Sequence, residues 1–274
     1  MSDPSSVIDD LREESEEADR LVARLGPEGW GLATPAAGWS VTHQIAHLAW
    51  TDRSALLAVT DPEGFRGLVE RALAAPHAFV DEGAEEYARL APTELLARWR
   101  EGRAALEKAL RSAPPGARFP WYGPPMAAAS MATARLMETW AHGLDIADAT
   151  GVARPPTGRL RHVARLGVRT RDFAYGVHGL TPPAEPFRVE LVAPESAGGE
   201  LWGYGPEDAP QRVTGPALDF CLLVTRRAHR ADLALTADGP DADRWLDIAQ
   251  AFAGPPGGGR PPKEEGRGGQ GHTP

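Results

Sequence analysis

The sequence predicts an α+β protein in which a helical N-terminal half precedes a smaller α/β region. Three observations lead to this. Residues 1–152 carry amphipathic helical patterns, short strand-like runs begin near residue 187, and the chain from residue 255 onward is rich in Gly and Pro. We therefore expect a helical domain over 1–152, an α/β domain over 153–254 and a disordered tail over 255–274.

Apolar residues that recur at helical spacing predict the helices of the first half. Ser40 is a suitable N-cap for the second helix and Thr93 for a later one, while Gly151 is suited to close the last. The segments are 6–25, 41–59, 65–87 with a break near Pro76, 94–113 and 127–149. These segments predict a bundle of packed helices.

The region after residue 152 alternates between helical and strand-like patterns, which is typical of α+β and α/β domains. The strands are expected over 187–193, 199–205, 211–215 and 232–238, and the helices over 160–175, 216–227 and 241–252. Cys221 lies in the apolar helix 216–227, so we interpret it as a core residue and not as a nucleophile.

The overall composition is that of a globular protein, and the net charge disfavours some classes of binding partner. Hydrophobic residues make up 42% of the 274 residues, and the formal net charge is -9. An acidic chain disfavours nucleic acid or an anionic membrane as partner, and no apolar run is long enough to span a bilayer. The acidic N-terminus lacks a secretory signal, and a lone cysteine forms no intrachain disulfide. We expect a cytoplasmic protein with a small-molecule substrate. The sequence leaves open whether the protein forms a homodimer.

The segment RLMETWAHGLDIADATG contains the most informative pair of residues. Glu138 and His142 are four residues apart. On a helix they share one face, where a carboxylate and an imidazole can bind a single metal ion. Asp145 lies on the same face and is a candidate for orienting His142. Taken alone, such a pair is more often a solvated pair or a helix cap.

A second segment, GWSVTHQIAHLAWTD, places His47 in an apolar stripe. A polar ring in that position needs a partner, which is either a backbone carbonyl or a metal. Together with Glu138 and His142, His47 gives three ligands and leaves one coordination position free, as in catalytic zinc sites. His43, four residues before His47, competes as a ligand or as a residue at the pocket mouth.

The motifs GWSVxxxIAHLAxxD and RxxExxAHGxDIADAxG resemble those of the DinB-like superfamily. Within it they resemble the mycothiol-dependent maleylpyruvate isomerase branch, an actinobacterial subgroup of which is described as metal-binding. The resemblance implies an N-terminal four-helix metal-binding bundle joined to a smaller α/β domain. It also implies that His47, Glu138 and His142 bind the metal, usually zinc, and that mycothiol acts as co-substrate.

The resemblance further implies an arginine of the C-terminal domain that reaches toward the site. Arg227 is the best positional match and Arg226 the second, although both would also suit the end of a helix, where cations complement the helix dipole. His43 departs from the family pattern, and we treat it with Arg227 as a candidate catalytic residue. Arg135 is the next candidate for binding a substrate carboxylate, or else pairs with Glu138.

The loop residues Trp121 and Tyr122 are predicted to line a substrate cleft or to form a separate hydrophobic cluster. For the whole chain, the resemblance implies a metal-dependent isomerase or S-transferase that acts on small electrophiles with mycothiol or a similar thiol. Two alternatives stay open. One is a thiol-independent metal-dependent hydrolase or isomerase, and the other is a non-catalytic protein that binds a metal or senses a small molecule.

Overall fold

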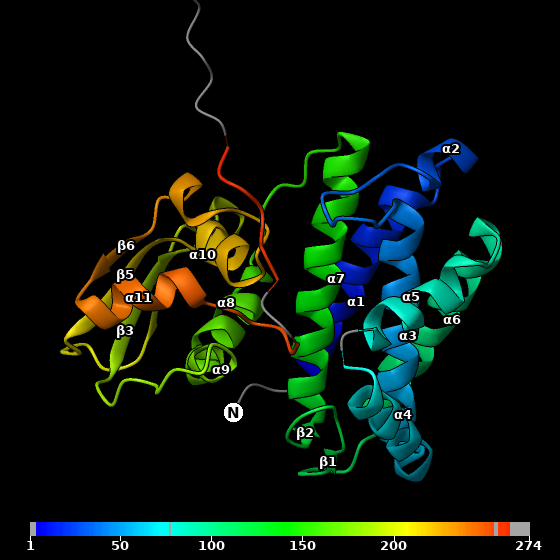
Figure 1. Ribbon diagram of the computed structural model, residues 1–274, viewed down its shortest axis with the longest axis horizontal. Helices are drawn as coiled ribbons and strands as arrows, with labels where there is room; N and C mark the ends of the chain where they lie inside the picture. The colour runs from blue at the N-terminus through cyan, green and yellow to red at the C-terminus, as the bar shows by residue number, and fades with distance from the viewer. Residues whose placement is uncertain (1–3, 77, 255–256, 264–274) are drawn as a thin grey trace, which may run out of the picture. The chain divides into compact units, whose positions relative to one another are not determined.

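Figure 1 shows the computed structural model, which describes residues 4–76, 78–254 and 257–263. It confirms an α+β protein that is mostly helical with a small mixed sheet. The chain divides into two compact units, Met1–Leu166 and Gly167–Pro274. This division lies inside a helix, later in the chain than the boundary after residue 152 that the sequence suggests.

The first unit is built from helices. They are α1 (Pro4–Val22), α2 (Pro27–Trp30), α3 (Val41–Thr60), α4 (Pro62–Ala74), α5 (Phe79–Ala88), α6 (Pro92–Arg111) and α7 (Ala128–Thr150). Just before α7, the short strands β1 (Arg118–Phe119) and β2 (Met126–Ala127) pair in antiparallel fashion. The break expected near Pro76 is confirmed, because α4 ends before it and α5 begins after it.

Four long helices enclose the core of this unit. Helix α1 packs against α6 and α7, and α3 packs against the same two helices. Helix α5 lies on α3, where Gly83 is required: a Cβ there would lie 2.3 Å from the ring of Trp50. The buried apolar residues of α3, α6 and α7 meet between the helices, so the position of α3 relative to α7 is fixed by packing.

Two of the expected helix ends are confirmed and one is wrong. Ser40 caps α3 in a capping box with the side chain of His43, and Gly151 closes α7 at φ 68°. Thr93 does not cap α6, because the helix already begins at Pro92, with Ala91 as the capping residue. The fixed φ of proline suits the first position of a helix, and this effect outweighs the hydroxyl of threonine.

The second unit contains a four-stranded sheet in the order β4-β3-β5-β6. Strands β3 (Phe187–Val192) and β5 (Gln211–Pro216) are parallel, while β4 (Leu201–Tyr204) and β6 (Thr236–Asp238) are antiparallel to their neighbours. The helical elements are α8 (Leu160–Arg169), which crosses the division between the units, α9 (Arg171–Val177), α10 (Ala217–Val224) and α11 (Pro240–Ile248), with 3-10 turns η1 (Glu195–Ala197) and η2 (Arg230–Asp232). Helices α10 and α11 pack on the central strands.

Part of the Gly/Pro-rich tail has defined contacts in this unit. The backbone N–H of Lys263 donates to Asp232 at 3.0 Å, and Gly259 lies against the side chain of Arg226. The rest of the segment predicted to be disordered, 255–256 and 264–274, lies outside the described residues. Among the residues that are described, no helix combines the length and the apolar character needed to cross a membrane.

Candidate metal centre

Helices α3 and α7 bring His47, Glu138 and His142 together. One oxygen of Glu138, Oε2, lies 3.2 Å from His47 Nε2 and 3.1 Å from His142 Nε2. The three potential ligand atoms all lie within 4.8 Å of one another. The two imidazole rings are 4.5 Å apart between centroids. The two helices predicted to carry the ligands therefore meet at His47, Glu138 and His142.

The cluster is largely withdrawn from solvent. His47 and His142 are 7% and 8% exposed, and Glu138 is half-buried. Burial by itself would raise the pKa of Glu138. The interactions of the carboxylate with the His142 and His47 rings outweigh it and hold the pKa of the carboxyl well below its usual range. Glu138 is therefore an anion over the whole physiological pH range.

Gln44 orients His142. Its Oε1 accepts a hydrogen bond from His142 Nδ1 at 2.5 Å, while its Nε2 donates to Thr34 Oγ1 at 2.8 Å. Thr34 Oγ1 in turn donates a hydrogen bond to the carbonyl of Trp39. This bond fixes the course of the backbone just before α3. Gln44 therefore orients His142, and the same role for Asp145 stays a prediction. A signal for Gln44 existed, because an amide side chain on the apolar face of a helix needs a partner.

The geometry of the cluster fits a divalent metal ion. With Nδ1 donating to Gln44, a neutral His142 presents an unprotonated Nε2 to the carboxylate of Glu138. Two acceptors then face each other at 3.1 Å, so a proton or a cation has to lie between them. Two imidazole nitrogens and one carboxylate oxygen form a donor set that zinc accepts in catalytic sites. The Nδ1 atom of His47 is buried and has no hydrogen-bond partner among the described residues.

A buried ion pair joins the two ligand helices close to the cluster. Arg135 on α7 donates from Nε to Asp52 on α3 at 2.8 Å and from Nη2 to Thr51 at 2.6 Å. Asp52 also accepts from the indole N–H of Trp99 at 3.0 Å. Arg135 pairs with Asp52 and not with Glu138, so the alternative of a pairing with Glu138 is wrong. The side chain is only 2% exposed, which disfavours the other alternative, a contact with a substrate carboxylate. It fixes α7 to α3 instead.

Trp39 and His43 lie beside the cluster. The ring of Trp39 stacks on His142 at 6.0 Å and lies 5.3 Å from His47. Both ring nitrogens of His43 have partners: Nδ1 accepts from Ser40, and Nε2 lies 3.3 Å from Glu85. The arrangement leaves His43 out of the three-residue cluster. Its expected catalytic role stays a prediction.

The aromatic loop forms a cluster of its own. Trp121 stacks on Phe65 at 5.6 Å with nearly parallel rings, and Tyr122 contacts both Phe65 and Phe79. Phe79 in turn meets Trp50, whose ring lies 6.1 Å from that of His47. Of the two expectations for this loop, the contacts favour a hydrophobic cluster over a cleft wall.

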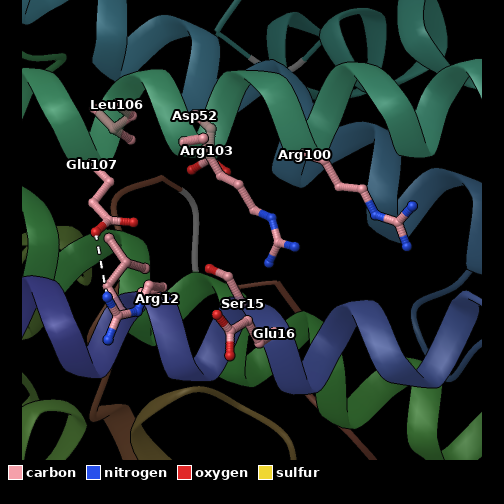
Figure 2. Close-up of a pocket in the computed structure, with 10 residues that line it drawn as sticks. Arg12, Ser15, Glu16, Asp52, Arg100, Arg103, Leu106 and Glu107 are labelled. Atoms are coloured by element: carbon pink, nitrogen blue, oxygen red, sulfur yellow. Dashed lines mark ion pairs between the residues drawn. The ribbon is translucent and has the colours of Figure 1, made fainter.

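A cavity of about 230 Å³ lies between α1, α3 and α6, where Asp52 and the two arginines Arg100 and Arg103 line it (Figure 2). Both arginines also bind Asp19 on α1, at 2.6–2.7 Å. The carboxylates of Asp19 and Asp52 therefore offset the charges of the two arginines. We assign no function to this cavity.

The remaining candidates lie in the second unit. Arg227 follows α10 and donates from Nη1 to the carbonyl of Thr225 at 2.7 Å. Its expected approach to the metal cluster stays a prediction. Cys221 is fully buried, and burial raises the pKa of its thiol well above the usual value. This confirms the interpretation of Cys221 as a core residue.

These features define an α+β protein with a buried histidine–carboxylate cluster between two long helices. The chain belongs to the family of the mycothiol maleylpyruvate isomerase N-terminal domain, whose model matches residues 11–147. This confirms the resemblance to the DinB-like, mycothiol-dependent isomerase branch. A second family model, described as wyosine base formation, matches residues 183–238, which include the strands of the second unit.

Full-length relatives and solved structures extend the comparison. The chain is 58% identical over 260 residues to uncharacterized proteins of Mycobacterium tuberculosis strains CDC 1551 and H37Rv; the match covers 95% of this chain and 100% of each relative. Its fold is similar to that of mycothiol-dependent maleylpyruvate isomerase, with a TM-score of 0.56, 17% identity, and 87% of this chain and 95% of the other covered. A histidine-to-alanine variant of that enzyme gives a TM-score of 0.57, 16% identity and the same coverage.

Proposed function

We propose that this protein is a divalent-metal-dependent enzyme that acts on small electrophiles with mycothiol or a similar low-molecular-weight thiol. The reaction would be of the isomerase or S-transferase type. One observation carries the proposal: in a member of the mycothiol maleylpyruvate isomerase family, the donor atoms of His47, Glu138 and His142 converge within 4.8 Å. Enzymatic function is thereby supported at the level of the family, and the thiol is the part that needs a test.

The protein residues have distinct tasks in this proposal. His47, Glu138 and His142 would hold the ion, which we propose to be zinc, and Gln44 keeps His142 in the tautomer that leaves Nε2 available. When bound, the metal would stabilise a coordinated thiol as its thiolate at neutral pH. Trp39 covers one side of the two histidine rings and keeps water from that face.

Two further residues have proposed roles in catalysis. His43 is partly exposed beside Trp39, so it would reach a substrate only if it gave up its contact with Glu85. Arg227 would bind an anionic group of the substrate through its guanidinium fork. The role of Arg227 rests on the family resemblance, and that of His43 rests on its position beside Trp39 and the cluster.

The alternatives differ in what they require of the metal site. A thiol-independent hydrolase or isomerase would use the same three ligands with water in the free position. A non-catalytic metal or sensor protein would be favoured by a fourth protein ligand. The engagement of His43 with Ser40 and Glu85 supports a three-ligand site and therefore an enzyme.

Metal content and thiol binding test the proposal in sequence. We expect close to one equivalent of metal in the purified protein, and loss of most of it in His47→Ala, Glu138→Ala and His142→Ala, because each substitution removes one of only three ligands. His178→Ala, which lies outside the cluster, is the control and should retain the metal. Elemental analysis that finds full metal content in Glu138→Ala and His142→Ala would contradict the site.

The second step uses the metal-loaded protein with mycothiol and a panel of small electrophiles. We expect mycothiol to bind only when metal is present, with turnover or a conjugate detected by mass spectrometry. A metal-loaded protein that does not bind mycothiol but hydrolyses an ester or an amide would favour the hydrolase alternative. One that does neither would favour a non-catalytic role.

A further inference from the structure

The second unit contains a cavity of about 630 Å³ between the end of α10, η2, α11 and the segment 257–260. Four leucines form most of its apolar wall: Leu223, Leu233, Leu235 and Leu246. Arg226 contributes to the lining from the turn that follows α10. None of the residues of the metal cluster lines this cavity, so its function can be considered separately.

Arg226 occupies a backbone conformation that favours glycine. Its φ is 60°, and among the described residues it alone combines positive φ with a side chain. The N–H of Arg226 bonds to the carbonyl of Leu223 and that of Arg227 to Leu222, which together form a Schellman motif at the end of α10. Glycine is the usual residue at this position, since a Cβ is strained there. An arginine at this position therefore costs folding stability.

The guanidinium of Arg226 adds a second cost. Its Nε and Nη2 atoms are buried and have no hydrogen-bond partner among the described residues. Burial lowers the pKa of Arg226, and no carboxylate in the described part of the chain offsets this effect. The nearby Arg230, by contrast, forms ion pairs with Asp243 and Asp247. The wall of the cavity thus contains one positive charge, that of Arg226, which none of the described residues neutralises.

The segment 257–260 encloses this charge. Gly259 lies against the side chain of Arg226, since a Cβ at Gly259 would be 3.6 Å from Cδ of Arg226. Gly258 and Arg260 also line the cavity. His229, on the rim, accepts from the backbone N–H of Ala231 through Nδ1, which leaves Nε2–H as its donor. The polar part of the wall therefore presents the donors of Arg226 and His229 next to an apolar surface. The carboxylate of Asp247 also lines the cavity, and Arg230 pairs with it.

We propose that this cavity is a binding site for a small organic anion. Its carboxylate or phosphate group would pair with the guanidinium of Arg226, and its apolar body would lie against the four leucines. A ligand of this class would neutralise the charge of the guanidinium, which explains why arginine stands at a glycine position. A neutral ligand would leave the charge of Arg226 uncompensated. An inorganic anion would make no contact with the four leucine side chains.

Calorimetry on the full-length, metal-free protein tests the site without any contribution from the metal or a thiol. The probes are benzoate and phenyl phosphate, with acetate and inorganic phosphate as anions that lack an apolar body and benzyl alcohol as the uncharged comparison. We expect saturable binding of benzoate, phenyl phosphate or both, at least tenfold tighter than that of the three comparison compounds. Absence of saturable binding by both aromatic anions, or equal binding of benzyl alcohol, would overturn the proposal.

Two substitutions that each remove one positive charge make the test specific. Arg226→Gly should weaken the binding of the aromatic anion at least tenfold, whereas Arg244→Ala, on α11 but outside the cavity wall, should change it less than twofold. Without ligand, Arg226→Gly should melt at or above the temperature of the unsubstituted protein, because glycine suits the backbone and the buried charge is gone. Unchanged binding, or a lower melting temperature, would show that Arg226 has a structural role instead.

Discussion

At the scale of single residues, the three proposed ligands differ in how far the sequence determines them. The pairing of Glu138 with His142 follows from helical spacing alone, because residues four apart share a face. His47 could be selected as a polar ring on an apolar stripe, but it is 91 residues from Glu138, and only the packing of α3 on α7 sets their distance. Gln44 was missed because its partner comes from the other helix.

The hydrogen bond from His142 to Gln44 predicts a loss of metal affinity in Gln44→Met. The substitution keeps the volume of the side chain but removes the acceptor, so His142 is free to turn or to change tautomer. We expect metal affinity to fall by roughly 10- to 100-fold, as for other residues that orient a ligand. Competition with a chromophoric chelator measures it. Thr34→Val removes the contacts of the Thr34 hydroxyl to the Gln44 amide nitrogen and to the carbonyl of Trp39 but leaves the bond from Gln44 to His142, so it should give a smaller loss. Equal affinity in all three proteins would contradict this role.

At the scale of secondary-structure elements, the sequence predicts helices well where a long apolar stripe defines them, as in α3 and α7. Short elements such as α2 and β1 escape detection, because they have too few residues to show a period. The contacts between elements cannot be predicted from the apolar pattern either. Nothing in the pattern of α1 indicates that Asp19 would be enclosed by Arg100 and Arg103 of α6.

The contact between Asp19 and α6 predicts a pH-dependent stability. Burial raises the pKa of Asp19, but hydrogen bonding to Arg100 and the charges of Arg103 and Arg100 outweigh it and lower the value. A carboxyl whose folded pKa lies below its unfolded pKa of about 3.9 stabilises the fold above that pH, and the stabilisation is lost as the pH falls through the folded value. We expect Asp19→Asn to lower the free energy of unfolding by about 2 kcal/mol at pH 7, and by progressively less below about pH 4.

Urea denaturation of the metal-free protein between pH 7 and pH 3 measures this difference. The metal is removed beforehand so that protonation of its ligands does not contribute. Asp208→Asn, in an exposed turn of the second unit, is the control and should match the unsubstituted protein at every pH. A deficit in Asp19→Asn that stays constant down to pH 3 would mean that packing and not charge is responsible.

At the scale of the whole molecule, the two units carry separate chemical features. The His47–Glu138–His142 cluster belongs to the first unit, and the cavity around Arg226 belongs to the second. Sequence periodicity predicts the change from helices to a mixed sheet, since the apolar period itself changes. It does not predict a cavity, because a cavity depends on how several segments close around a volume. Here Gly258 and Gly259 are part of that closure, although their composition suggests only a flexible tail.

A chain that ends at Gly254 separates these two features. Its metal content should equal that of the full chain, because all three ligands lie in the first unit. The melting temperature should change little, since a Gly/Pro-rich segment buries too little apolar surface to add much stability. Affinity for the aromatic anions should fall several-fold, because the segment that covers Arg226 is gone. Elemental analysis, thermal denaturation and calorimetry measure the three quantities, and loss of metal together with anion binding would mean that the tail supports both units.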